Sequence, residues 1–117
     1  MTGMLSDIKV LDLTTFLSGP YCTMVLSDMG ADVVKLETPR KGCATRKNPP
    51  FINGESAYFM SLNRGKKGLT LNLKSEQGKK IFLQLVADAD VLVENFRPGV
   101  MERLGFDYER ISRVNPK

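Results

Sequence analysis

The chain has 117 residues, 42% hydrophobic and 26% charged, with a formal net charge of +4. This length and composition fit one soluble globular domain with a modest core, and no apolar run approaches the roughly 18 residues of a membrane span. The chain has no histidine, and its two cysteines, Cys22 and Cys43, fit no metal-ligand or redox spacing. A zinc site or a Ser-His-Asp triad therefore cannot be completed within these residues, and we expect no metal.

Charge and the start of the chain limit the partners further. Residues 1–7 carry neither a basic segment nor a long apolar one, so they do not resemble a signal peptide and we expect a cytoplasmic protein with no membrane partner. The mild positive charge fits an anionic ligand such as a nucleotide or a phosphate ester, and it equally fits a surface that only keeps the chain soluble. Basic residues are spread along the chain rather than packed in a run, so we expect no nucleic acid as partner.

The first third of the chain predicts a strand, a helix and a second strand. Residues 8–13 read as the first strand, Pro20 suits the start of a helix over residues 21–29, and Gly30 suits the end of that helix. Residues 31–37 read as the second strand. This order predicts a parallel pair of strands joined by a right-handed crossover.

The two strand ends of this unit suggest little by themselves. A dinucleotide-binding loop has three glycines after the first strand, whereas this loop has only Gly19, so binding of NAD or FAD in the usual manner is not expected. Glu37 ends the second strand, where an acidic residue can bind a ribose but is more often simply solvated. Both interpretations of Glu37 stay open.

The middle of the chain predicts a long basic loop and a short helix. Residues 38–53 hold three prolines and four basic residues, which could meet phosphates or could only be solvated. Residues 55–62 predict a short helix with buried aromatic side chains, and residues 63–68 a basic turn. Leucines alternate over residues 69–73 and predict a third strand.

A helix and a fourth strand follow. Ser75 should cap a helix that runs to about Ala87. The side chains expected to face inward are Ile81, Phe82, Leu85 and Val86. Residues 91–93 are a short apolar run that predicts a buried strand, and Pro98 with Gly99 then breaks the backbone.

The end of this fourth strand is a candidate site. In an open α/β sheet the ligand crevice lies at the carboxyl ends of the strands. The strand leads directly into Asn95, Phe96 and Arg97, which offer an amide, an apolar ring and a permanent charge. A strand that simply runs into a polar turn is the commoner case, so both interpretations remain open.

The last part of the chain predicts two short helices. Residues 100–104 read as a helix stopped by Gly105, and Asp107 should cap a helix over residues 108–114. Asn115 and Pro116 open a turn that normally leads onward. We therefore expect residues 1–117 to be the N-terminal part of one large α/β domain, followed by another strand.

Several stretches in order, from about Leu5 to Lys117, resemble the family III CoA-transferases, the family of formyl-CoA and carnitine CoA-transferases and of α-methylacyl-CoA racemase. The stretches that carry the resemblance are residues 10–14 with 18–20, 30–37, 45–46, 63–67 and 90–99. Each is weak alone, but their order and separations match. The resemblance implies a Rossmann-like open parallel sheet flanked by helices, as part of a larger fold that forms interlocked homodimers.

The resemblance also implies an activity. It indicates an acyl-CoA:carboxylate CoA-transferase, which moves coenzyme A from an acyl-CoA to a carboxylic acid through an aspartyl-bound intermediate. The nucleophilic aspartate is expected beyond Lys117, so this piece alone should be inactive, with coenzyme A or acyl-CoA as substrate and no metal. Two alternatives remain open: a racemase of α-methylacyl-CoA and a CoA-binding fragment without catalysis.

Carried over residue by residue, the resemblance assigns parts of a CoA site. Leu17 and Ser18 would lie near the thioester, and Arg103 would meet a phosphate. The adenine and its ribose phosphate would be flanked by Leu71, Asn72, Leu73 and Lys74. The pantetheine and diphosphate would be held by Asn95, Phe96 and Arg97.

Two differences from formyl-CoA transferase and the length of one segment refine this assignment. Thr38 stands where formyl-CoA transferase has an arginine, and Arg40 is expected to take over that role. Leu17 stands where the same enzyme has a glutamine, which argues against oxalate or formate as the acyl partner. Residues 48–62 have a transferase-like length, which favours a transferase over a racemase.

Overall fold

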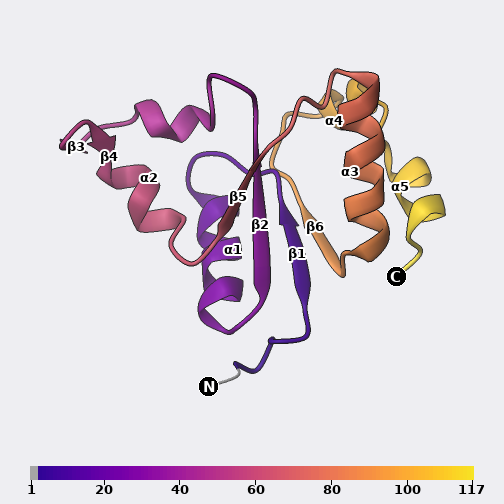
Figure 1. The fold of residues 1–117 in the computed structure, drawn as a ribbon, viewed down its shortest axis with the longest axis horizontal. Coiled ribbons are helices and arrows are strands. Elements are labelled where there is room, and N and C mark those ends of the chain that lie inside the picture. The colour runs from indigo at the N-terminus through magenta and orange to yellow at the C-terminus, as the bar shows by residue number, and fades with distance from the viewer. Residues whose placement is uncertain (1–2) are drawn as a thin grey trace.

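Four parallel strands form the central sheet of the computed structural model, which describes residues 3–117 (Figure 1). The strands are β1 (Lys9–Asp12), β2 (Asp32–Glu37), β5 (Lys67–Thr70) and β6 (Val91–Val93), in the spatial order β5-β2-β1-β6. The chain winds from β1 through β2 to β5 in one direction and then crosses back to place β6 on the other side of β1. This reversal is typical of Rossmann-like sheets and confirms the predicted fold class.

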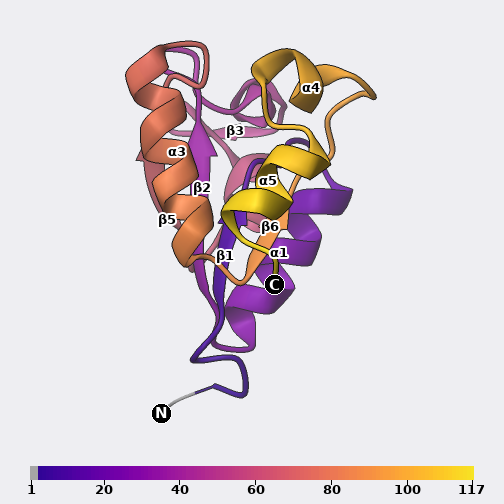
Figure 2. The same ribbon diagram turned by 90° about the vertical axis from the view of Figure 1, so that its right-hand side faces the viewer.

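Helices cover both faces of the sheet (Figure 2). On one face lies α1 (Ser18–Asp28), where Leu26 packs with Val10 and Val33. On the other face lie α3 (Glu76–Asp88) and α5 (Tyr108–Val114), which pack around the larger apolar cluster. The centre of that cluster is Phe82, whose ring centroid lies 4.5 Å from that of Phe106. Because successive strand residues point to opposite faces, the two clusters divide the side chains of β1, β2 and β6 between them.

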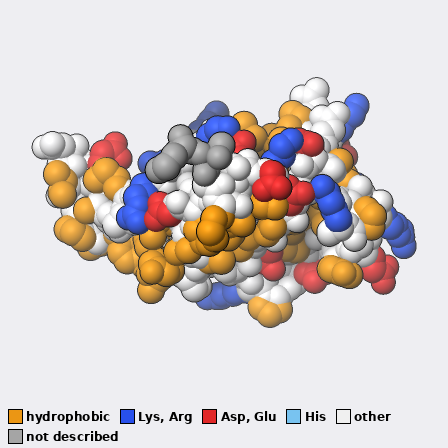
Figure 3. Space-filling model, turned by 90° about the horizontal axis from the view of Figure 1, so that it is seen from below, with side chains coloured by type: hydrophobic (Ala, Val, Ile, Leu, Met, Phe, Trp, Pro, Cys, Tyr) orange, Lys and Arg blue, Asp and Glu red, His pale blue; other side chains and the backbone are white. Residues whose placement is uncertain are grey.

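The remaining elements lie near the carboxyl ends of the strands. They are the 3₁₀ helix η1 (Ala44–Lys47), β3 (Phe51–Ile52), β4 (Glu55–Ser56), α2 (Ala57–Leu62) and α4 (Val100–Leu104). Residues 51–62 form an arm at the left of Figure 1, and Figure 3 shows hydrophobic side chains at this end of the molecule. Phe51 and Ile52 are both exposed there. No helix among residues 3–117 is long and apolar enough to cross a membrane.

The predicted helix ends are confirmed where a cap defined them. Ser75 Oγ accepts a hydrogen bond from the Gly78 N–H at 3.0 Å, and Asp107 Oδ1 accepts one from the Arg110 N–H at 2.8 Å. Gly105 ends α4 with a φ of 86°, which glycine adopts without strain. Helix α1, in contrast, begins at Ser18 rather than at residue 21, so Pro20 lies in its first turn.

Two predicted strands differ from the structure. The third was expected at residues 69–73, but β5 spans Lys67–Thr70, because pairing with β2 places Leu69 opposite Leu36. Leu71 and Leu73 lie beyond the end of β5. They continue the alternation of leucines because they pack against the larger apolar cluster. The fourth was expected to be buried, but β6 is an edge strand with one neighbour, and Val91 is exposed.

Three smaller expectations also need correction. Ile81 was expected to face inward but is 44% exposed, since Phe82 and Val86 already occupy the buried face of α3. The aromatic rings of α2 are half-buried rather than buried. The loop predicted over residues 38–53 contains η1 and β3.

Candidate functional site

A cavity of about 560 Å³ opens at the carboxyl ends of the strands. Residues that follow all four strands line it, as expected for the crevice of an open α/β sheet. The lining residues are Leu13, Thr14, Thr15, Leu36, Glu37, Thr38, Pro39, Lys41, Gly42, Cys43, Ala44, Lys47, Leu71, Asn72, Leu73, Lys74, Phe96, Val100 and Leu104. The size falls within the usual range for small-molecule and cofactor sites.

The lining combines an apolar surface with a basic one. Leucines from three strand ends, together with Phe96 and Val100, supply the apolar part. Lys41, Lys47 and Lys74 are exposed residues of the same lining. This combination suits a ligand that has a flat or apolar portion and separate anionic groups, such as a nucleotide.

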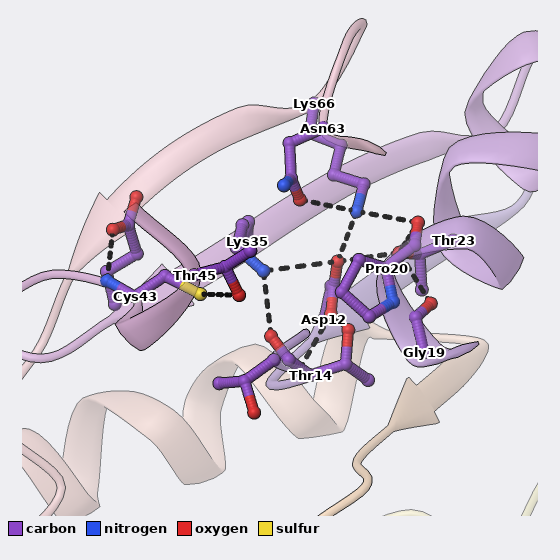
Figure 4. A network of polar contacts seen from close by, with 12 residues as sticks. Asp12, Thr14, Gly19, Pro20, Thr23, Lys35, Cys43, Thr45, Asn63 and Lys66 are labelled. Atoms are coloured by element: carbon purple, nitrogen blue, oxygen red, sulfur yellow. Dashed lines mark hydrogen bonds and ion pairs between the residues drawn. The ribbon is translucent and has the colours of Figure 1, made fainter. Parts of the chain in front are cut away.

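Beside the cavity, Asp12 is the centre of a buried polar network (Figure 4). Its Oδ1 accepts hydrogen bonds from the N–H and the hydroxyl of Thr14. Its Oδ2 accepts one from the Thr23 hydroxyl at 2.6 Å and one from Lys66 Nζ at 2.8 Å. Lys35 Nζ lies 3.9 Å from Oδ2 and donates to the Thr14 carbonyl at 2.8 Å. All four acceptor positions of the carboxylate are therefore used inside the protein.

The two lysines of this network are as buried as the aspartate. The Lys66 and Lys35 side chains are 2% and 3% exposed. Lys66 Nζ donates to Asp12, to the Pro20 carbonyl and to Asn63 Oδ1, so each ammonium proton has an acceptor. One buried carboxylate thus faces two buried ammonium groups, which is costly unless every partner is in place.

The network shifts the ionisation of its members. Burial alone would raise the pKa of the Asp12 carboxyl, but Lys35, Lys66 and the threonine hydroxyls outweigh it and hold that pKa below its ordinary value. Burial lowers the pKa of Lys66, against the opposing effect of Asp12. We infer that the Asp12 carboxyl remains ionised throughout the neutral range.

The loop that leaves β1, residues 13–17, is fixed by side chains from other elements. Thr15 and Asn95 form a reciprocal pair, in which the Thr15 N–H donates to Asn95 Oδ1 at 2.9 Å and Asn95 Nδ2 donates to the Thr15 carbonyl at 2.7 Å. The Phe16 N–H donates to Thr45 Oγ1 at 2.7 Å. Phe16 has a φ of 65°, which a non-glycine residue seldom adopts. We call residues 13–17 the β1 exit loop.

A second ion pair fixes the loop that leaves β2. Arg46 donates two hydrogen bonds of 2.8 Å to the Glu37 carboxylate, and its guanidinium lies 3.9 Å from the ring centre of Phe59. The Cys43 N–H donates to the same carboxylate at 2.6 Å. The Arg46 hydrogen bonds hold the pKa of Glu37 below its ordinary value, against the opposing effect of burial. Glu37 is therefore neither simply solvated nor free to bind a ribose.

The structure brings five of the predicted site residues to the cavity. Those that line it are Leu71, Asn72, Leu73, Lys74 and Phe96. Those that do not line it are Leu17, Ser18, Arg40, Asn95, Arg97 and Arg103. All of the second group are exposed, and they lie in the β1 exit loop, at the start of α1, in the β2 loop, after β6 and on α4. Their proposed ligand contacts stay predictions.

Sequence reasoning missed Lys41 and Lys47, which line the β1–β2 side of the cavity, and Lys66, which supports that side without lining it. Lys41 and Lys47 had been noted only as cations of a loop, and Lys66 only as part of a basic turn. A lysine in a turn carries no sequence signal that it will be buried against an aspartate 54 residues earlier. Among residues 3–117, no group of three or more acidic, Cys or His side chains gathers closely enough to hold a metal ion.

The chain is similar to curated CoA-transferases. It is 49% identical over 115 residues to an acetyl-CoA:oxalate CoA-transferase of Acetobacter aceti, a match that covers 98% of this chain and 30% of that protein. It is 51% identical over 119 residues to a succinyl-CoA:mesaconate CoA-transferase of Haloarcula marismortui, covering 97% of this chain and 30% of that protein. The chain thus spans about 30% of the length of these relatives.

A sequence model and solved structures agree with these matches. The family described as CoA-transferase family III matches residues 5–117. The crystal structure of a CAIB/BAIF family protein from Brucella suis superposes with a TM-score of 0.90 at 41% identity, covering 98% of this chain and 32% of that one. A protein from Mycobacterium tuberculosis gives a TM-score of 0.90 at 40% identity, with 99% and 32% covered.

Proposed function

The chain belongs to CoA-transferase family III, and from this premise we propose that it forms the CoA-binding part of an acyl-CoA:carboxylate CoA-transferase. The observation that carries the proposal is the cavity at the carboxyl edge of the sheet, with its apolar surface and three lysines. The names of the similar proteins support transfer between an acyl-CoA and a carboxylic acid, in preference to the racemase alternative or a non-catalytic CoA-binding fragment.

In this proposal the two parts of the lining bind two parts of coenzyme A. The adenine packs against Leu71 and Leu73, and Phe96 packs against the pantetheine. The phosphates lie toward the lysines, which act as flexible point charges, and Lys74 meets the ribose phosphate. Arg97 and Arg103 are exposed just outside the lining and reach inward to the diphosphate when the ligand is present.

The thioester end of the ligand leaves the cavity past the β1 exit loop, toward Leu17 and Ser18. Transfer through an aspartyl-bound intermediate needs a carboxylate that attacks the thioester carbon, releases the coenzyme A thiolate as a mixed anhydride forms, and then takes up that thiolate at its own carbonyl carbon as the donor's carboxylate leaves. Asp12 cannot supply it, because its side chain is fully buried and both oxygens are bonded. We place the nucleophilic aspartate outside residues 1–117.

The proposal includes an assembly and a location. The whole protein forms an interlocked homodimer in the cytoplasm, and residues 1–117 belong to its large CoA-binding α/β domain. Leu17 argues against oxalate or formate as the acyl partner, because its apolar side chain cannot hydrogen-bond a small carboxylate.

Calorimetric titration with coenzyme A tests the proposed ligand. Lys74→Glu should weaken binding by about tenfold or more, because a hydrogen bond to a charged group contributes about 1.5–3 kcal/mol. Lys80→Glu is the matched control, since Lys80 is also exposed and gives the same change in net charge but does not line the cavity. A folded chain that does not bind coenzyme A, or an equal loss in both variants, would refute the proposal.

A further inference from the structure

Three consecutive residues of the β1 exit loop have backbone groups held by side chains from four separate parts of the chain. Asp12 and Lys35 hold both backbone groups of Thr14. Asn95 holds both groups of Thr15, and Thr45 accepts from the N–H of Phe16. A loop with this many side-chain bonds cannot relax around a ligand in the way that an ordinary surface loop does.

The network fixes the part of the β1 exit loop that lines the cavity. Leu13, Thr14 and Thr15 line the cavity, and the left-handed backbone at Phe16 redirects the chain into α1. Such a conformation persists only where the surroundings fix it, and here the residues on both sides are fixed. The Lys9–Asp88 ion pair at the opposite, amino-terminal end of the sheet is exposed, in contrast to the buried pairs of Asp12.

Asp12 connects these contacts but cannot touch a ligand. Its side chain has no exposed surface, and it reaches the cavity only through Thr14. Lys66 extends the same network to the Pro20 carbonyl in the first turn of α1. A change at Asp12 would therefore be transmitted to the β1 exit loop and to the start of α1 together.

We propose that Asp12, supported by Lys66, Lys35 and Thr23, is a positioning residue that sets the geometry of the β1 exit loop for the ligand of the cavity. The inference rests on the proposed function, because it takes that ligand to be coenzyme A. The buried charged groups then fix the geometry of the site in addition to stabilising the sheet. Affinity for coenzyme A should then depend on side chains that never touch it.

Thr23 offers a mild way to test this proposal, since removal of Asp12 itself could prevent folding. Thr23→Val keeps the shape but removes the donor to Asp12 Oδ2, whereas Thr23→Ser keeps that donor. Amide hydrogen exchange of the ligand-free chain should become at least tenfold faster at residues 14–16 in Thr23→Val, with little change in α3. Coenzyme A should bind several-fold more weakly to Thr23→Val, and Thr23→Ser should restore both properties.

A core variant separates positioning from stability. Val86→Ala lowers stability through the larger apolar cluster without touching the network, so the folded protein should keep its affinity for coenzyme A. Equal affinities for the valine and serine variants would overturn the inference, as would faster exchange that spreads evenly over the chain. If the folded wild type does not bind coenzyme A, the proposed function fails and the positioning of that ligand with it, while exchange at residues 14–16 still decides whether the network holds the loop.

Discussion

The two sides of the cavity are built in different ways. On one side, residues 13–15, 37–39 and 41–43 are held by the buried Asp12 network and by the Glu37–Arg46 pair, and we call them the β1–β2 wall. On the other side, residues 71–74 form the β5 wall, where Asn72 and Lys74 are exposed. The hydrogen bonds of Asn72 are local: its side chain accepts from the Lys74 N–H at 3.0 Å, and its carbonyl accepts from Ser75 Oγ at 3.0 Å.

Substitutions in the two walls should therefore change different quantities, namely stability in one and ligand affinity in the other. In the β1–β2 wall, Glu37 and the Asp12 that supports it are paired before any ligand arrives, so their loss should appear as lost stability, although Lys41 of the same wall is exposed. The β5 wall leaves its lysine in solvent, so its contribution should appear only when an anion binds.

Asp12→Ala should destabilise the chain by about 3–5 kcal/mol, because it leaves the ammonium groups of Lys35 and Lys66 buried without their carboxylate. Urea unfolding measures the change. The control is Asp32→Ala, whose ion pair with Lys67 is exposed and should contribute less than about 1 kcal/mol. If the chain lacking Asp12 does not fold, Lys66→Met should still show a clear loss. Comparable losses for Asp12 and Asp32 would show that the buried network stabilises the chain no more than an exposed ion pair does.

Glu37→Gln should cost roughly 1–1.5 kcal/mol at pH 7, at the low end for charged hydrogen bonds, because the Arg46 side chain is 42% exposed. The pKa of Glu37 is lowered in the folded chain, so its stabilisation is complete above the ordinary value of 4.5 and is lost as the pH falls below it. The stability gap between wild type and variant should therefore shrink between about pH 5 and pH 3. Unfolding curves measured across this range check the sign, and a gap independent of pH would count against a charge effect.

Ser75→Ala should cost about 1 kcal/mol, the usual loss when a helix cap is removed. Because Ser75 also bonds the Asn72 carbonyl, the substitution should loosen the β5 wall slightly as well. Ser75→Asp keeps an acceptor for the Gly78 N–H and should unfold close to the wild type in thermal denaturation. An aspartate variant as unstable as the alanine variant would show that the hydroxyl's bond to Asn72, rather than the cap, matters.

Lys74→Glu should change stability by no more than about 0.5 kcal/mol, since its side chain is exposed and makes no ion pair within residues 3–117. The same variant is the one expected to weaken coenzyme A binding most clearly. Urea unfolding and calorimetry on one preparation check both statements. A large loss of stability at Lys74 would mean that the β5 wall, too, is fixed before the ligand binds.

The parts of the molecule that sequence could predict are those with local causes. Ser75, Gly105 and Asp107 mark helix ends through bonds or backbone angles within a few residues, and the structure has each of them as expected. The parallel pairing of β1 with β2 also followed from the alternation of strands and helices. The β5 wall was found in another way, through the family resemblance, which assigned Leu71, Asn72, Leu73 and Lys74 to the ligand.

The parts that sequence could not predict depend on long-range pairing. The alternation over Leu69, Leu71 and Leu73 suggested a strand two or three residues too late, because only pairing with β2 fixes where β5 begins and ends. Lys66 is buried only because the fold brings it to Asp12, and a lysine in a basic turn is normally solvated. The β1–β2 wall was missed for this reason.

The paired hydrogen bonds between Asn95 and Thr15 restrict which residue can occupy position 95. One short side chain must present an acceptor to the Thr15 N–H and, beside it, a donor to the Thr15 carbonyl. Asparagine does so with its amide. Aspartate has the same shape but only accepts, and leucine offers neither group. Variation at this position should therefore be tolerated far less than its exposure suggests, so that drift in sequence is limited here by hydrogen-bond chemistry rather than by packing.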